Sequence, residues 1–141
     1  MNEHISLAAG VIIVENDHIL LVYEKGHWSL PKGKKEVKES MLEAAIREAK
    51  EETGLDVLVN DVAFVTEFIR ENNRYYIQVY YEATIIGGEI HAGNDPDQEI
   101  EAVEFKPIDQ LDEYLSFEPR LVPLKKWLKE RKTSYHFFNL T

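Results

Sequence analysis

Apolar residues along the chain cluster in short runs rich in β-branched and aromatic side chains, a pattern that predicts strands. The longer runs expected to form strands are Leu7–Val14, Ile19–Tyr23, Leu55–Val59, Val62–Ile69, Tyr75–Ile85 and Glu99–Phe105. A shorter strand is predicted at Trp28–Leu30, within a segment whose glycines and proline otherwise predict a loop. Residues 15–18 and 72–73 separate neighbouring runs, and their asparagines and aspartate predict tight turns.

The segment Glu39–Thr53 changes to the three-to-four spacing of an amphipathic helix. Its expected buried stripe consists of Leu42, Ala45 or Ile46, and Ala49.

Two later segments, Ile108–Leu115 and Pro119–Arg131, also have helical patterns, the second with proline in its first turn. Strands with a few interspersed helices are typical of an α/β fold, in which helices pack on a mixed β-sheet. A length of 141 residues fits one domain, and no repeat, low-complexity stretch or linker interrupts the chain. We therefore expect a single domain over residues 1–141.

The chain contains no cysteine, which excludes thiol catalysis, thiolate zinc sites and disulfide bonds. This composition is consistent with a reducing compartment. The longest apolar run near the start, Leu7–Val14, is too short to span a membrane and lacks the basic segment that precedes it in a signal peptide. We expect a cytoplasmic protein without a membrane partner.

The formal net charge is −10. Generic binding to nucleic acid or to an anionic membrane requires a basic face, so this charge argues against both as partners. If the substrate is itself anionic, positive charge must be supplied locally. A metal cation is the obvious source.

Three glutamates of the predicted helix, Glu48, Glu51 and Glu52, stand three and four residues apart. Residues at that spacing are neighbours on one helix face, where like charges repel. A hard divalent cation such as Mg²⁺ reverses the repulsion because it prefers carboxylate oxygen ligands. A glutamate-rich face that is simply solvated is the alternative interpretation of these three residues.

A longer pattern surrounds these glutamates. In order, it consists of Gly33, five residues, Glu39, seven residues, Arg47-Glu48, an apolar residue, any residue, Glu51-Glu52, any residue, Gly54 and an apolar residue. This pattern matches the Nudix box without a gap, and the chain therefore resembles the Nudix (MutT-like) hydrolase family. The box covers Gly33–Leu55, and the order of strands, loop and helix around it extends the likeness to nearly the whole chain.

The resemblance implies an α/β/α sandwich with a mixed β-sheet, in which the box forms a loop, a helix and a loop. It implies that Glu48, Glu51 and Glu52 hold the catalytic cations, Mg²⁺ or alternatively Mn²⁺. It also implies a small nucleotide substrate, a nucleoside diphosphate linked to another group and cut at a phosphoanhydride bond. Cations bridging a pyrophosphate neutralise its charge and lower the barrier to attack by water.

Four other box residues receive supporting roles from the resemblance. Arg47, which we class with the catalytic residues, is expected to pair with the box carboxylates and orient them. Glu39 is expected to support the site through hydrogen bonding or water. Gly33 and Gly54 match positions where the backbone turns sharply, and Gly54 follows the helix where a left-handed cap is expected.

A general base must accept the proton of the attacking water. We favour Glu99, whose place ahead of Glu104-Phe105 resembles that of an extra metal-binding glutamate in some family members. Glu101 and Glu104, on the same predicted strand, and Glu67, on another, are the other candidates. An exposed strand charge is the alternative interpretation of Glu99.

The segment Trp28–Gly33 resembles the lead-in to the box of Nudix enzymes that act on dinucleoside polyphosphates, where a lysine before the glycine is frequent. Lys32 is expected to contact outer phosphates, and Lys34, Lys35 and Lys38 add positive charge at the mouth of an otherwise acidic protein. A dinucleoside polyphosphate is therefore the favoured substrate. A solvated lysine loop is the alternative.

Three aromatic residues, Trp28, Tyr76 and Tyr80, are candidate surfaces for stacking a base, although aromatics on strands are more often core residues. Strand alternation places Tyr76 and Tyr80 on one face with Gln78, which makes that face more polar, as a pocket wall would be. Arg70 is a candidate phosphate ligand or a residue that flanks the adjacent turn.

Other functions remain open at this stage. A housecleaning pyrophosphatase for non-standard nucleoside triphosphates would use the same metal site with a different pocket. A catalytically silent nucleotide sensor would usually show gaps in the box, and a 5′-end RNA pyrophosphohydrolase fits poorly with the acidity of the chain. The apolar segment 135–138 is expected to pack on its own domain or on a second subunit, so both a monomer and a homodimer are consistent with it.

Overall fold

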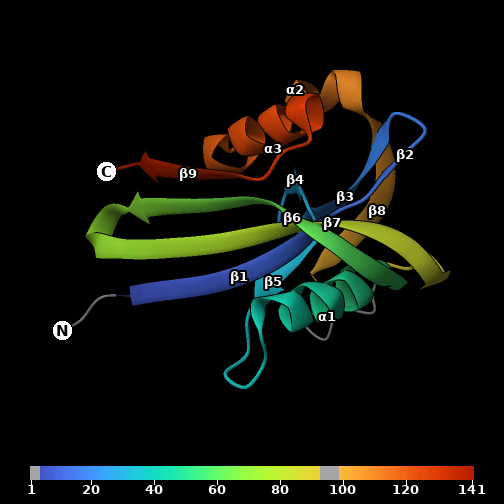
Figure 1. Ribbon diagram of the computed structural model, residues 1–141, viewed down its shortest axis with the longest axis horizontal. Coiled ribbons are helices and arrows are strands. Elements are labelled where there is room, and N and C mark those ends of the chain that lie inside the picture. The colour runs from blue at the N-terminus through green and yellow to red at the C-terminus, as the bar shows by residue number, and fades with distance from the viewer. Residues whose placement is uncertain (1–3, 93–98) are drawn as a thin grey trace.

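Two β-sheets organise the residues that the computed structural model describes, which are 4–92 and 99–141 (Figure 1). The strands are β1 (His4–Ile12), β2 (Val14–Glu15), β3 (His18–Glu24), β4 (His27–Ser29), β5 (Lys32–Lys34), β6 (Leu55–Arg70), β7 (Arg74–Gly88), β8 (Ile100–Pro107) and β9 (Ser134–Asn139). The helices are α1 (Met41–Thr53), α2 (Leu111–Tyr114) and α3 (Glu118–Glu130), with short 3-10 turns η1 (Glu71–Asn73) and η2 (Ile108–Gln110).

The larger sheet is mixed, with the strand order β5-β1-β7-β6-β9. Strand β1 runs parallel to β7 and β9 runs parallel to β6, whereas the other neighbours are antiparallel. In the smaller sheet, β3 pairs antiparallel with β2, β4 and β8. The α/β fold with a mixed sheet is confirmed.

Helices cover both faces of the larger sheet (Figure 1). Helix α1 packs on β1 and β6, and α3 packs on β6 and β9 from the opposite side. Under α1 the core contains the small residues Ala45 and Ala49, and under α3 it contains Phe64, Leu124 and Trp127. The α/β/α layering therefore places α1, with its glutamates, at one surface of the molecule.

Helix α1 begins at Met41, two residues later than the sequence predicts, because Ser40 caps it. The Ser40 hydroxyl accepts from the Glu43 backbone N–H, and the Glu43 carboxylate accepts from the Ser40 backbone N–H, which forms a capping box. Gly54 ends the helix in the left-handed conformation, with φ of 82°, as predicted.

The predicted buried stripe of α1 is partly wrong. Ala45 and Ala49 are buried together with Ala44, whereas Leu42 is 41% exposed and Ile46 39% exposed. The alanine face lies against the sheet, and its small side chains let the helix pack closely. The larger aliphatic side chains are left on the outer surface.

The strands differ from the sequence predictions in several places, including β5, which lies within a predicted loop. Segments 55–59 and 62–69 form one strand, β6, because register shifts between Val59 and Phe64 absorb the polar pair Asn60-Asp61 as a bulge. The run Leu7–Val14 is divided at Ile13, where the chain passes from the larger sheet to the smaller one. Residues 135–138, which showed no strand signal, lie in β9.

The predicted turns are confirmed. Asn16 and Asp17 have φ of 51° and 61° in the β2–β3 hairpin, and Asn72 and Asn73 have φ of 66° and 58° between β6 and β7. Asparagine and aspartate adopt this left-handed region more readily than other side chains. No helix in the described part of the chain has both the length and the hydropathy needed to cross a membrane.

Candidate metal and substrate site

Three glutamates of α1 line a cleft of about 760 Å³ between α1, β5 and the end of β3. Glu48, Glu51 and Glu52 all contribute to its wall, as the resemblance implies. The Ser40 cap and the Gly54 cap determine where α1 starts and ends, and they therefore place these glutamates beside the cleft. The box thus begins in strand β5 at the edge of the larger sheet, where a loop was expected, and continues through a loop into helix α1 on the face of that sheet and the Gly54 cap.

Arg47 joins the box carboxylates into one network. Its Nη1 donates to Glu48 Oε2 at 3.0 Å and to Glu51 Oε2 at 2.9 Å. Its Nη2 and Nε donate to the two oxygens of Glu39 at 2.6 and 3.0 Å, and Nη2 also donates to the Lys34 carbonyl oxygen at 2.9 Å. The predicted pairing of Arg47 with the box glutamates is therefore present, and Arg47 also fastens the helix to β5.

The hydrogen bonds of Arg47 shift the pKa values of Glu39 and of Arg47 itself. The hydrogen bond from Arg47 lowers the pKa of Glu39 to about 2, and the backbone N–H of Glu36 assists it. Conversely, the Glu39 hydrogen bond raises the pKa of Arg47 above its usual range. Glu39 is therefore held as an anion that supports Arg47.

Gly33 is required by the position of Glu48. A β-carbon built on Gly33 would overlap the Glu48 carboxylate, so β5 and α1 approach each other only because this residue has no side chain. Its backbone lies in the β1–β5 ladder, where Gly33 pairs with Ala9. The glycine is thus explained by close approach to the site and by no unusual turn.

Glu52 is the buried member of the set, with 5% of its surface exposed. Its carboxylate accepts the Lys32 backbone N–H at 3.1 Å. Burial, followed by the nearby Glu24 carboxylate, raises the pKa of Glu52 to about 9. Glu52 therefore holds a proton at neutral pH unless a cation offsets its charge.

Glu24 is a site residue that the sequence did not reveal. It ends β3, is 8% exposed and lines the same cleft as the α1 glutamates. Its Oε1 lies 3.5 Å from Lys32 Nζ, so the lysine predicted to contact phosphates already has an anionic neighbour. Glu24 lies outside the box, and a glutamate at the end of an apolar strand carries no local signal.

The donor set fits a hard divalent cation, because three carboxylates from one helix line a single cleft. As the side chains stand, no three of the described histidine, aspartate and glutamate residues are arranged to hold an ion. Glu48 and Glu51 are hydrogen-bonded to Arg47 Nη1 instead. A cation would therefore compete with Arg47 for these two carboxylates.

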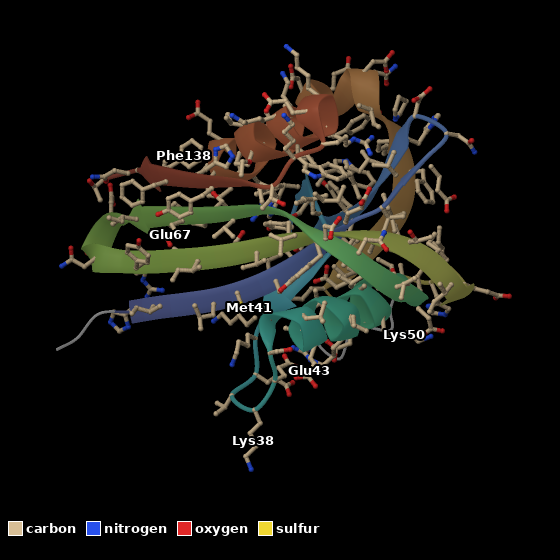
Figure 2. All side chains as sticks on the ribbon, in the orientation of Figure 1. Lys38, Met41, Glu43, Lys50, Glu67 and Phe138 are labelled. Atoms are coloured by element: carbon tan, nitrogen blue, oxygen red, sulfur yellow. The ribbon has the colours of Figure 1, made fainter. Side chains whose placement is uncertain are left out.

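The candidate general bases separate by location. Glu99 lines the cleft, with its Oε1 3.3 Å from Lys25 Nζ. Glu67 is wrong as a candidate, because it accepts hydrogen bonds from Tyr75 and Tyr135 on the sheet, away from α1 (Figure 2). Glu101 and Glu104 point elsewhere too, since neither lines the cleft and Glu104 pairs with Lys106 at 2.6 Å.

A second pocket of about 400 Å³ adjoins the cleft and shares Lys32 and His27 with it. Of the residues predicted to bind substrate, Lys32, Arg70 and Tyr76 line this pocket. The structure adds Phe68 from β6 and Phe117 and Arg120 from the start of α3, which the sequence did not single out. Phe68 lies far along the chain from Phe117 and Arg120, so no local pattern connects all three.

Two predicted stacking residues lie elsewhere. Tyr80 is fully buried, and its ring stacks on Phe64 at 4.9 Å between centroids, so it offers no face to a base. Trp28 packs against Tyr23 and Tyr114, with Lys106 Nζ 4.5 Å from its ring centroid, and it does not line the second pocket. Both residues belong to the core on the α3 side of the larger sheet.

The lysines near the box divide into two groups. Lys32, Lys34 and Lys35 line the carboxylate cleft, as expected for a positive mouth. Lys38 lies at the tip of the loop before α1 and points away from the body of the protein (Figure 2). Only the first group is placed to contact a substrate in the cleft.

Fold and site together define a class of protein: a mixed α/β sandwich that presents acidic residues of one helix, ordered by an arginine, to a cleft with a basic rim. The family described as the NUDIX domain matches residues 4–128. The chain belongs to the Nudix family.

Named relatives are similar over part of their length. An ADP-ribose pyrophosphatase from Methanocaldococcus jannaschii is 36% identical over 98 residues, which cover 65% of this chain and 58% of that protein. The 8-oxo-dGDP phosphatase NUDT18 from Mus musculus is 33% identical over 94 residues, which cover 63% of this chain and 28% of that protein. The chain thus spans less than two thirds of either relative.

Among solved structures, an ADP-ribose pyrophosphatase from Streptococcus suis 89-1591 is similar with a TM-score of 0.70 and 28% sequence identity. The match covers 94% of this chain and 98% of that one.

Proposed function

We propose that this protein is a divalent-metal-dependent pyrophosphohydrolase that cuts a phosphoanhydride bond in a nucleoside diphosphate linked to another group. One observation carries the proposal: Glu48, Glu51 and Glu52 line one cleft whose rim carries Lys32, Lys34 and Lys35. Carboxylates of this kind suit a divalent cation, and the lysines suit the phosphates that the cation would bridge.

Glu48, Glu51 and Glu52 would hold the cation, Mg²⁺ or Mn²⁺. When bound, the cation would offset the negative charge of the substrate phosphates and would favour ionisation of the attacking water. Arg47 orients Glu48 and Glu51, since one Nη1 donates to both. Lys32 binds phosphate oxygen from the side of the second pocket, which it also lines.

Glu99 accepts the proton of the attacking water in this proposal. Of the four carboxylates weighed for that role, only Glu99 lines the cleft. Attack forms a phosphorus–oxygen bond to water, the bridging bond between the two phosphates breaks, and the freed phosphate leaves as an anion. Glu99→Gln should lower kcat with little change in KM, because it removes the proton acceptor and leaves the binding groups in place.

The substrate we favour is a dinucleoside polyphosphate. The cleft and the second pocket meet at Lys32, so a long phosphate chain in the cleft could continue to a nucleoside in the pocket. ADP-ribose is a second candidate, because two similar proteins are named ADP-ribose pyrophosphatases. Non-standard nucleoside triphosphates form a third group.

A panel of dinucleoside polyphosphates, ADP-ribose, nucleotide sugars and nucleoside triphosphates tests the function, with products identified for each and with Mg²⁺ or Mn²⁺ added after chelation. We expect hydrolysis that requires metal and falls at least about a hundredfold in Glu51→Gln and Glu52→Gln, since each removes a ligand charge. Metal-independent turnover, or near-normal rates in both variants, would show that these glutamates do not form the site.

Lys32→Ala tests the preference for long phosphate chains. A charged hydrogen bond contributes about 1.5–3 kcal/mol, so efficiency on a dinucleoside tetraphosphate should fall roughly tenfold to a hundredfold. The loss should be at the lower end because Glu24 already shares the charge of Lys32. ADP-ribose, with two phosphates, should lose less. Equal losses on both substrates would remove the argument for a long chain and leave the metal chemistry intact.

A further inference from the structure

The second pocket is basic in a protein with a net charge of −10. Three of its lining side chains are cations, Lys32, Arg70 and Arg120, and no aspartate or glutamate of residues 4–92 and 99–141 lines it. Like charges gathered in a partly desolvated space repel one another more than they do in water. An anion placed among them would relieve that repulsion.

Arg120 is the strongest part of this observation, because only 6% of its surface is exposed. Its Nε donates to the Tyr80 hydroxyl at 2.8 Å and its Nη2 to Gln78 Oε1 at 3.3 Å. Both partners are neutral, and within the described ranges no carboxylate lies within 4.0 Å of the guanidinium. A buried charge without a counter-charge is costly, so a ligand that supplies one gains binding energy.

The guanidinium groups of Arg70 and Arg120 both lie over the ring of Phe117. Its Cζ lies 4.8 Å from the Phe117 ring centroid, and the Cζ of Arg120 lies 5.1 Å from it. Thr66 holds the start of α3 in place, since its buried hydroxyl donates to the Pro119 carbonyl oxygen at 2.7 Å. The packing of α3 on β6 therefore positions Phe117 and Arg120, and Arg70 at the end of β6 lies over the same ring.

We propose that this pocket binds an anionic group, separate from the pyrophosphate that is cut, next to a planar part of the ligand. Arg70 and Arg120 bind the anion, a phosphate or a carboxylate, with the fork geometry that guanidinium offers to both. Phe117 and Tyr76 provide the flat surfaces. Lys32 connects the pocket to the cleft, so the anion belongs to the group linked to the nucleoside diphosphate, and this last step rests on the proposed function.

Binding of small ligands to the second pocket is measured first in the presence of a chelator, so that a bound metal does not contribute. Phenyl phosphate, benzoate and benzyl alcohol share a ring and differ in the attached group, so calorimetric titration with each separates phosphate, carboxylate and ring alone. We expect the better anion to bind about tenfold or more tightly than the alcohol, as a charged hydrogen bond requires. No saturable binding of either anion up to about 10 mM would overturn the proposal.

Arg70→Gln and Arg120→Lys identify the groups responsible. Arg70 is exposed, so its removal should leave the fold intact, and Arg120→Lys keeps the buried charge while losing the fork. Each should weaken anion binding about tenfold. The matched control is Arg131→Gln, because Arg131 also lies over a ring, 4.6 Å from the Trp127 centroid, but lies outside the pocket. Unchanged binding in both pocket variants would show that Arg120 serves only to hold Tyr80 and Gln78.

UDP-glucuronate and UDP-glucose then test the anion part of the substrate step, since they differ only at C6 of the linked sugar, a carboxylate in the first and a hydroxymethyl group in the second. We expect higher kcat/KM for the glucuronate, and a smaller ratio in Arg70→Gln but not in Arg131→Gln. Anion binding without any hydrolysis would support the pocket and contradict the proposed function. Hydrolysis with equal efficiency on both sugars would contradict the substrate step.

Discussion

Arg47 is the residue on which the order of the site depends. Four carboxylates surround it: Glu39, Glu48 and Glu51 by hydrogen bonds and Glu36 at 3.8 Å from Nε. Lysine could supply the same charge but not the planar fork, which donates in three directions at once. Arg47 therefore orders the site through the directions of its hydrogen bonds as well as through its charge.

Arg47→Ala should lower kcat/KM about 10–100-fold, the usual effect of removing a group that orients metal ligands. It should also lower the free energy of unfolding in chelator, because the ion pairs of Arg47 with Glu39, Glu48 and Glu51 are lost. Arg47→Lys should recover little of the activity. Steady-state kinetics and denaturant unfolding measure the two effects, and full activity in the lysine variant would show that charge alone suffices.

Glu52 should make stability depend on pH in the absence of metal. Its folded pKa of about 9 lies above the ordinary value of 4.5, so the folded protein binds this proton more tightly than the unfolded chain does. The resulting stability is fully present below about pH 4.5 and is lost as pH rises through about 9. Glu39 has the opposite sign, because its pKa of about 2 gives stability that is lost as the pH falls from about 4.5 towards 2.

Denaturant unfolding of the wild type and of Glu52→Gln in chelator, at several pH values, isolates this contribution. The free energy of unfolding of the wild type should fall relative to that of the variant between about pH 4.5 and 9. Added Mg²⁺ should reduce the difference, because a cation favours the ionised carboxylate. Parallel pH profiles for the two proteins would mean that Glu52 is ionised in the folded protein.

At the scale of elements, the decisive contact is between β5 and α1. Gly33→Ala introduces a β-carbon where the Glu48 carboxylate lies, so the carboxylate or β5 must move. Metal-dependent activity should fall about tenfold or more, because even a small displacement of Glu48, a proposed metal ligand, lowers the rate. Gly87→Ala is the control, because its nearest neighbour, Asp56 Oδ2, would lie 3.3 Å from the new atom and belongs to an exposed side chain. Similar activity of both variants would show that Glu48 adapts without cost.

The sequence predicted the residues of the candidate site better than it predicted the packing of the elements. Gly33, Arg47 and the α1 glutamates lie in one short segment, so their spacing alone indicates the site. Helix α1 was harder to orient, since Leu42 and Ala45 both fit an apolar stripe and only packing against the sheet selects the alanines. Strand β9 was missed because its uncharged, aromatic sequence has no flanking turn signal.

At the scale of the whole molecule, the second pocket could not be predicted. Phe68, Tyr76 and Arg120 come together only when β6, β7 and α3 are assembled. Alternation correctly placed Tyr76, Gln78 and Tyr80 on one face, but whether a face lines a pocket or is covered by a helix is a tertiary property. Helix α3 covers Tyr80 and leaves Tyr76 at the pocket.

Deletion of residues 134–141 should destabilise the whole protein. Strand β9 pairs with Phe64–Ile69 of β6, and its loss would leave that part of β6 as an unpaired edge. Unpaired edges promote association between molecules, so we expect a lower midpoint of thermal unfolding and concentration-dependent aggregation, measured by light scattering. A variant with Phe137→Ser alone, which keeps the backbone pairing at a half-exposed position, is the control. An equally stable, monodisperse truncation would mean that β9 adds nothing to the sheet.

The pairing of β9 with β6 also sets the order of events during translation. Each residue of β6 that pairs with β9 leaves the ribosome 70 residues before its partner, as for Phe64 and Ser134, and β7 completes only the other side of β6. Until residues 134–139 emerge, Phe64–Ile69 of β6 form a sheet edge without the neighbour that β9 provides. Because β6 and β9 lie far apart in the sequence, we expect their pairing to be slower than the formation of a hairpin. Until then the exposed edge of β6 is a surface to which chaperones that recognise unpaired strands can bind.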